Sequence, residues 1–210
     1  IDKSVFWASS KLQALRYVKE PVVIMDNDFI VYKSFHSFLQ DKTVVAHEED
    51  GENYYLNPLD GYIQQVKHII NRPALKAINC SFLYLPDFKF TQYYAKTSLE
   101  LMEEFTKIKV PNSKYLIYSE QLLLKHLLDQ LNIQYNSLID RVYNCSTDKF
   151  ERKIEGLIKS SKSGLYYRHY WKQKPKIKDS KDGFSYKEEV DQLENIVKNR
   201  ILIDWTVIDA

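Results

Sequence analysis

The chain has 210 residues, of which 44% are apolar, and its 30 basic and 28 acidic residues leave a net charge of +2. This is enough chain for one domain with a real core, and the near-neutral balance gives no reason to expect a nucleic-acid partner. No apolar run approaches the roughly 20 residues that a transmembrane helix needs. The two cysteines, Cys80 and Cys145, make neither a disulfide framework nor a zinc site. We therefore expect a reducing, cytoplasmic location.

The predicted elements begin with a helix and a buried strand. Ser10–Gln13 has the pattern of a capping box, and the apolar residues behind it recur at helical spacing until Pro21 ends the helix. Val22–Met25 is continuous, apolar and mostly β-branched, which predicts a central strand buried on both faces. Further on, the pair Asp50-Gly51 predicts a hairpin or loop, and Asp60 is placed to cap a helix.

The alternation of strands and helices continues to the end of the chain. A strand is predicted at Ala77–Leu85, and helices at Thr91–Lys107, after Ser119 as N-cap, at Phe150–Ser161 and, packing on the outside, at Ser185–Trp205. This alternation predicts an α/β fold with a mixed, mainly parallel sheet flanked by helices. In such sheets, ligands bind beyond the carboxyl ends of the strands.

Two carboxylates, Asp26 and Asp28, stand between the strand Val22–Met25 and a second apolar run. An ionised carboxylate in such surroundings needs a cation, hydrogen-bond donors or water. Residues two apart in an extended segment point the same way, so the pair could share one divalent ion, and carboxylate oxygens suit Mg²⁺ or Mn²⁺. A solvated turn is the alternative, and the apolar runs on both sides argue against it.

Two other places carry residues with functional chemistry. His169 lies among aromatic residues and is followed by lysines. It is either a metal ligand beside phosphate-binding cations or a core histidine beside a solvated basic run. Glu120 and Gln121 stand at a predicted helix N-terminus. There an acidic residue either complements the helix dipole or, together with its neighbour, faces a substrate.

Four segments of the chain follow one another in a familiar order. The stretch "SSKLQALRYVKEPVVIMDNDFIVYKSF" joins a lysine-bearing helix, a strand, an acidic D-x-D and a second short strand, and "NCSFLYLPDF", "SEQLLLKHLL" and "RHYWKQKP" come after it. Between Lys11 and Lys176 the chain resembles GT-A-fold glycosyltransferases of the glycogenin and lipopolysaccharide-galactosyltransferase type. The resemblance implies a GT-A-like fold and the transfer of a sugar from a nucleotide diphosphate, most simply UDP, to a glycan or other hydroxyl acceptor.

The resemblance also implies roles for residues on the diphosphate side. Asp26 and Asp28 would hold Mn²⁺ or Mg²⁺ against the diphosphate, and His169 would complete the metal shell. Lys174 would neutralise the leaving diphosphate, and Lys11 would approach the nucleotide-sugar. The chemistry agrees with these roles, because the departure of a nucleoside diphosphate needs cations where negative charge builds up.

On the sugar and acceptor side, the resemblance implies Asn79, Glu120 and Gln121. The Asn-Ala-Gly of those enzymes reads Asn79-Cys80-Ser81 here, without the glycine that allows a close backbone approach to a sugar. A non-catalytic GT-A-like binding domain is the alternative function. A metal-dependent phosphodiester hydrolase is a third, and it would need more converging carboxylates.

The start of the chain leads to a further expectation. Only 25 residues precede Asp26, whereas the similar enzymes place a base-binding part before their D-x-D. We interpret residues 1–210 as a single GT-A-like domain that lacks this N-terminal nucleotide-binding part. A strand edge exposed in this way tends to recruit another chain, so self-association is expected.

Overall fold

The structure is a computed structural model that describes residues 1–51, 57, 60–70 and 76–169. The chain divides into two compact units, one of Ile1–Asp26 with Phe35–Ser161 and one of Asn27–Ser34 with Lys162–Ala210. The helix predicted at Ser185–Trp205 lies outside the described residues, as does most of the loop predicted after Asp50.

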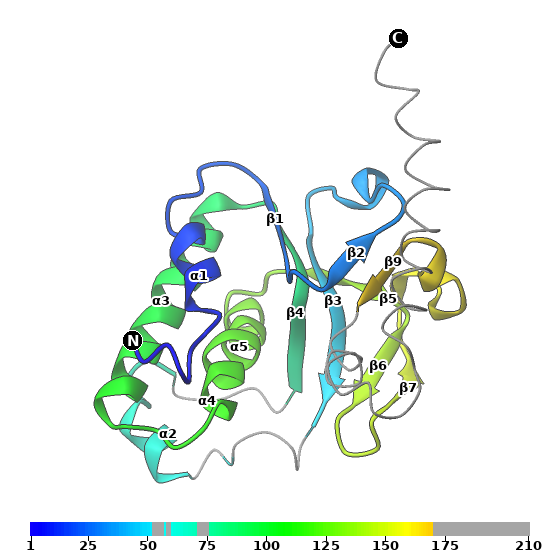
Figure 1. Cartoon of the computed structure of the whole chain (residues 1–210). Coiled ribbons are helices and arrows are strands. Elements are labelled where there is room, and N and C mark those ends of the chain that lie inside the picture. The colour runs from blue at the N-terminus through cyan, green and yellow to red at the C-terminus, as the bar shows by residue number, and fades with distance from the viewer. Residues whose placement is uncertain (52–56, 58–59, 71–75, 170–210) are drawn as a thin grey trace, which may run out of the picture. The chain divides into compact units, whose positions relative to one another are not determined.

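The first unit combines helices with a sheet (Figure 1). Its helices are α1 (Ser9–Leu15), α2 (Gly61–Gln65), α3 (Phe88–Lys107), α4 (Lys114–Ile117) and α5 (Leu123–Gln130), with a 3-10 turn η1 (His36–Phe38) and a π-helical turn η2 (Tyr118–Leu122). Its strands are β1 (Val22–Met25), β3 (Thr43–Asp50), β4 (Lys76–Leu85), β5 (Tyr135–Ile139), β6 (Arg141–Asn144), β7 (Lys149–Lys153) and β8 (Gly156–Ile158), after which a second 3-10 turn, η3 (Ser160–Leu165), begins.

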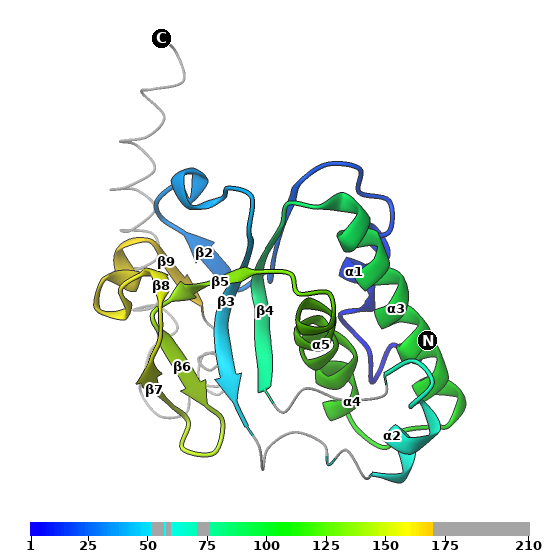
Figure 2. The same ribbon diagram turned by 180° about the vertical axis from the view of Figure 1, so that it is seen from behind.

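These strands form one seven-stranded mixed sheet with the order β1-β4-β3-β5-β8, while β6 pairs with β3 and β7. Three pairings are parallel (β3–β5, β3–β6, β5–β8) and three are antiparallel (β1–β4, β3–β4, β6–β7). The predicted α/β class with helices beside a mixed sheet is confirmed. A mainly parallel sheet is wrong for the described residues, because β4 runs against both of its neighbours and β7 folds back on β6 (Figure 2).

β1 has the predicted bounds, but it is not a central strand. Among the described residues it pairs with β4 alone, which places it at the edge of the sheet. Val23 and Met25 are 37% and 45% exposed, whereas Val22 and Ile24 pack against the hydrophobic core. The predicted burial on both faces is therefore wrong. A short β-branched run suits a half-buried edge strand equally well.

Strand pairing accounts for two other differences from the sequence prediction. β3 was not predicted, although it pairs with β4, β5 and β6. The helix predicted at Phe150–Ser161 is wrong, because β7 and β8 occupy most of that stretch. All side chains of β7 are exposed, and its backbone is instead held by pairing with β6. A pattern of apolar side chains carries little information about such a strand.

Helix starts depend on whether a side chain reaches the first N–H groups. Asp60 caps α2 as predicted, since its carboxylate accepts from Tyr62 N at 2.8 Å. Asp87 caps α3, which therefore begins slightly before the predicted start. The capping box predicted from Ser10 is wrong, because Ser10 lies inside α1 and this helix has no side-chain cap.

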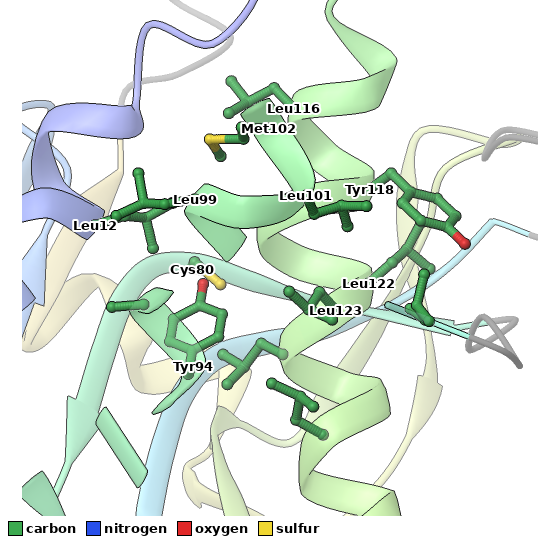
Figure 3. Packing of buried hydrophobic residues seen from close by; sticks show 14 of the residues in the cluster. Leu12, Cys80, Tyr94, Leu99, Leu101, Met102, Leu116, Tyr118, Leu122 and Leu123 are labelled. Carbon is green, nitrogen blue, oxygen red and sulfur yellow. The ribbon is translucent and has the colours of Figure 1, made fainter. Parts of the chain in front are cut away.

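The hydrophobic core of the first unit lies between its helices and β4, and α1, α3, α4 and α5 gather on the same side of that strand (Figures 1 and 2). Leu12 from α1, Leu99 and Met102 from α3, and Leu123 from α5 are all buried in it (Figure 3). Removing one such leucine side chain typically costs about 2–5 kcal/mol. This packing holds α1 against α3. Of the helices in the described ranges, none combines the length and the apolar character needed to span a bilayer.

Gly156 in β8 is a position where a side chain cannot be accommodated. An added Cβ would lie 2.4 Å from Asp140 N and from the carbonyl carbon of Ile139, and neither backbone atom can move aside cheaply. We expect Gly156→Ala to lower the free energy of unfolding by about 1–3 kcal/mol or more, measured by urea denaturation. Gly61→Ala is the matched control, because nothing lies within 4 Å of its added Cβ. It should leave the stability unchanged or slightly higher, and equal midpoints for both variants would contradict the prediction.

Candidate functional site

In the second unit, β2 (Phe29–Val31) and β9 (Tyr167–His169) form an antiparallel pair (Figure 1). Phe29 lies opposite His169 in this register, so Asp28, one residue earlier, reaches the imidazole. Asp28 Oδ1 lies 3.6 Å from His169 Nε2, and the two side chains are 9% and 12% exposed. This distance is too long for a good hydrogen bond and is compatible with two ligands that each lie about 2.1 Å from one ion.

Aromatic packing encloses this pair. The Phe29 ring stacks on Tyr167 with a centroid distance of 4.6 Å and lies 5.7 Å from the His169 ring. Burial raises the pKa of Tyr167 well above the usual range of a phenol. Phe29 therefore helps to fix the His169 ring in place, and Tyr167 supports Phe29. Lys174, which was predicted to neutralise the diphosphate, lies outside the described residues.

Asp26 belongs to the first unit and follows β1 directly. Its N–H donates to Ser81 O at 2.9 Å, and its Oδ1 accepts a hydrogen bond from Lys11 Nζ at 3.1 Å. Lys11 also forms an ion pair with Glu120. Within this unit, Lys11 thus supplies the positive charge that compensates Asp26.

The sequence predicted Glu120 at a helix N-terminus, and this prediction is wrong. Glu120 lies in η2, between α4 and α5, and Ser119 does not cap a helix, since its Oγ donates to Tyr115 O at 2.7 Å. π-Helical turns inside helices occur frequently at functional sites. Gln121, the next residue of the same turn, is half-buried.

The ion pair between Lys11 and Glu120 is enclosed, and Glu120 is 4% exposed. Burial raises the pKa of Glu120, and the nearby Lys11 partly offsets this rise. Burial alone would lower the pKa of Lys11, but attraction to Glu120, and less strongly to Asp26, raises it above the usual range. Lys11 is therefore a charged ammonium group that two carboxylates hold in place.

Cys80 and Tyr94 lie beside this pair. The Tyr94 hydroxyl donates to the backbone oxygen of Glu120 at 3.3 Å and points toward the Cys80 sulfur (Figure 3). Burial raises the pKa of both groups far above neutrality. Both remain protonated and uncharged at physiological pH, so they add no negative charge beside Lys11, which faces Glu120 and Asp26.

Asn79 lies on β4 and belongs to a different cluster. Its Nδ2 donates to Glu49 Oε1 at 2.7 Å, and its Oδ1 accepts from Ser81 N at 3.0 Å. The same Glu49 oxygen lies 3.4 Å from His47 Nε2. The sequence prediction missed His47 and Glu49 because it missed β3. The signal was a histidine and a glutamate two residues apart, directly after the apolar run Val44–Ala46, which places both on one face of a strand.

A comparison with protein families identifies the chain. A model described as a family of unknown function, DUF6734, matches residues 2–188. The chain belongs to this family. Comparisons with curated proteins and with solved structures gave no match. The description of this family assigns no activity, so the function is inferred from the chemistry of the side chains.

In this DUF6734 chain the described residues offer two distinct kinds of chemistry. The second unit presents a carboxylate and an imidazole at a distance suited to one metal ion. The first unit presents a buried ammonium group held by Asp26 and Glu120. Asp26, of the first unit, precedes Asp28, of the second, by two residues in the sequence.

Proposed function

We propose that this member of DUF6734 is a GT-A-like, divalent-metal-dependent glycosyltransferase that moves a sugar from a nucleotide diphosphate to a hydroxyl acceptor. Asp26, Asp28 and His169 bind Mn²⁺ or Mg²⁺, and each of them is able to offer one ligand atom. The observation that carries the proposal is the approach of Asp28 to His169, two residues far apart in the sequence.

The residues present fit such an ion. Two carboxylates and one imidazole form a mixed oxygen and nitrogen set, which suits Mn²⁺ and would leave ligand positions for diphosphate oxygens and water. The two-residue spacing keeps the Asp26 carboxylate within reach of an ion bound at Asp28. A metal held there would supply positive charge against the diphosphate as the bond to the sugar breaks.

In this proposal, other residues of the chain bind the diphosphate and the sugar. Lys11, which Glu120 anchors, provides a fixed positive charge next to Asp26. The half-buried amide of Gln121 is suited to hydrogen bonds with sugar hydroxyls. Asn79, whose amide already bonds Glu49 and Ser81, is assigned to the sugar side on the resemblance alone. Lys174 is assigned to the leaving diphosphate on the resemblance alone.

A non-catalytic GT-A-like binding domain is the second candidate. It is favoured by the contacts of Lys11 with both Asp26 and Glu120, because these three side chains satisfy one another as a purely structural network would. A phosphodiester hydrolase would need more converging carboxylates, and the ligands proposed for the ion are two carboxylates and one histidine.

The test is a calorimetric titration of UDP with and without Mn²⁺. We expect binding that depends on Mn²⁺, and we expect His169→Ala to weaken it at least about tenfold, or 1.4 kcal/mol. His68→Ala is the control, because His68 is an exposed histidine of the first unit. Mn²⁺-dependent release of UDP from UDP-glucose or UDP-galactose would then separate a transferase from a binding domain. UDP binding that is indifferent to Mn²⁺ would refute the proposal.

A further inference from the structure

Lys11 joins two carboxylates that differ in their surroundings. Its Nζ contacts Glu120 on one side and Asp26 Oδ1, at 3.1 Å, on the other. The Glu120 side chain is 6% exposed, whereas that of Asp26 is 40% exposed. The contact with Glu120 is thus shielded from water, and the contact with Asp26 is open to exchange.

The backbone around Lys11 has little freedom to move. Leu12, its neighbour in α1, is fully buried in the hydrophobic cluster beside Leu99 of α3 (Figure 3). Gln92 of α3 donates to Val18 O at 2.7 Å, which ties the segment after α1 to the same helix. A change at this site must therefore come from the lysine side chain and not from a shift of α1.

A divalent ion bound to Asp26 would meet this ammonium group at short range. Metal–oxygen distances are about 2.1 Å, so the ion and Nζ would be on the order of 5 Å apart. At an effective dielectric constant of about 20, a charge of +2 and a charge of +1 at this distance repel by several times the thermal energy. Lys11 therefore opposes the binding of the ion to Asp26, both by occupying the carboxylate and by repulsion.

Anionic ligands reverse this balance. A diphosphate placed between the ion and the lysine would be attracted by both, since phosphate oxygens accept hydrogen bonds from an ammonium group. The lysine thus lowers the affinity of the site for the ion alone and raises its affinity for the ion together with a diphosphate. This difference is a coupling free energy between two ligands, and it acts equally on the affinity of each.

We propose that Lys11 is a resident counter-cation that competes with the divalent metal for Asp26, so that the metal binds tightly only together with a nucleoside diphosphate. In this proposal Lys11 acts on the metal through Asp26 and on the diphosphate through its own ammonium group. This inference rests on the proposed function and deepens it, because it assigns the order and the coupling of metal and nucleotide binding to one side chain.

Three proteins test this proposal by calorimetric titration of Mn²⁺ alone and of Mn²⁺ with saturating UDP. The first is the wild type and the second is Glu120→Gln, which leaves Lys11 with Asp26 as its acidic contact. The third is the double variant Lys11→Met with Glu120→Gln, which removes both charges and so leaves no unpaired ion in the interior. Urea denaturation confirms that each protein is folded.

Without UDP, we expect Mn²⁺ to bind the double variant about tenfold more tightly than it binds the wild type. We expect it to bind Glu120→Gln more weakly than the wild type. The factor by which UDP strengthens Mn²⁺ binding should fall about tenfold in the double variant. The matched control replaces Lys125 and Asp129, an ion pair on α5 whose lysine side chain is 15% exposed, by Met and Asn. This control should leave the Mn²⁺ titrations unchanged.

The outcomes separate this inference from the proposed function. A double variant that binds Mn²⁺ no more tightly than the wild type, with the same enhancement by UDP, would overturn the role of Lys11 and leave the metal site intact. A wild type that binds no Mn²⁺, with or without UDP, would overturn the proposed function and this inference with it.

Discussion

Lys11→Met should lower the free energy of unfolding by about 3–5 kcal/mol, because it leaves Glu120 ionised and without a cation in the interior. Urea denaturation at neutral pH measures this loss. Adding Glu120→Gln to Lys11→Met should recover most of it, since an uncharged pair of similar volume has no desolvation cost to offset. Lys107→Met is the control, because its ion pair with Glu104 is solvent-exposed, and it should leave the midpoint nearly unchanged.

The loss in Lys11→Met should also depend on pH, with a definite sign. Burial already raises the pKa of Glu120 above 4.5, and removing the lysine that offsets this effect raises it further. A group with a raised pKa in the folded state stabilises the fold below its unfolded value and loses that contribution as the pH rises. The free energy of unfolding of Lys11→Met should therefore be close to that of the double variant near pH 4. It should fall progressively below that value as the pH rises toward 7. A constant difference between these two proteins from pH 4 to pH 7 would contradict this explanation.

Local signals in the sequence predicted the elements that local chemistry decides. Pro21 placed the start of β1, and the apolar run at Ala77–Leu85 gave β4 within one residue. Asp60 was recognised as a cap because a carboxylate before a helix can accept from its first N–H groups. These features depend on a few neighbouring residues, so a single sequence contains enough information to find them.

The features that the sequence did not predict depend on partners far along the chain. β7 is a strand because β6 lies beside it, and β1 is an edge strand because, among the described residues, only β4 pairs with it. The contact of Lys11 with Glu120 joins α1 to a π-helical turn that no spacing rule anticipates. Periodicity describes one element at a time and carries no information about which elements meet.

The candidate metal ligands are an instructive exception. Asp28 and His169 were expected together because of a resemblance to glycosyltransferases, and the structure brings them within 3.6 Å of each other. The resemblance supplied long-range information that the residues alone did not contain. It did not supply the competing role of Lys11, which became apparent from the two carboxylates around its ammonium group.

The last prediction concerns the two carboxylates of the D-x-D. In the double variant Asp26→Asn with Asp28→Asn, the affinity for Mn²⁺ should fall by roughly 10²–10⁴-fold, because two charged contacts of about 1.5–3 kcal/mol each are lost. Without metal, the free energy of unfolding should change by less than about 1 kcal/mol. Asn keeps the shape of Asp, and the ion pair that Asp26 forms with Lys11 is partly exposed.

Thermal unfolding makes this prediction easy to measure. At a Mn²⁺ concentration 100 times the dissociation constant, binding stabilises the wild type by about 2.7 kcal/mol, which raises Tm by about 5–10 °C for a chain of this size. The double variant should show no such rise. Asp41→Asn with Asp129→Asn is the control, because it removes the same charge from two exposed positions and should keep the wild-type response. An equal rise of Tm in the D-x-D variant would mean that the ion binds elsewhere, and contacts within the protein, among them those with Lys11 and His169, would then account for Asp26 and Asp28 between two apolar strands.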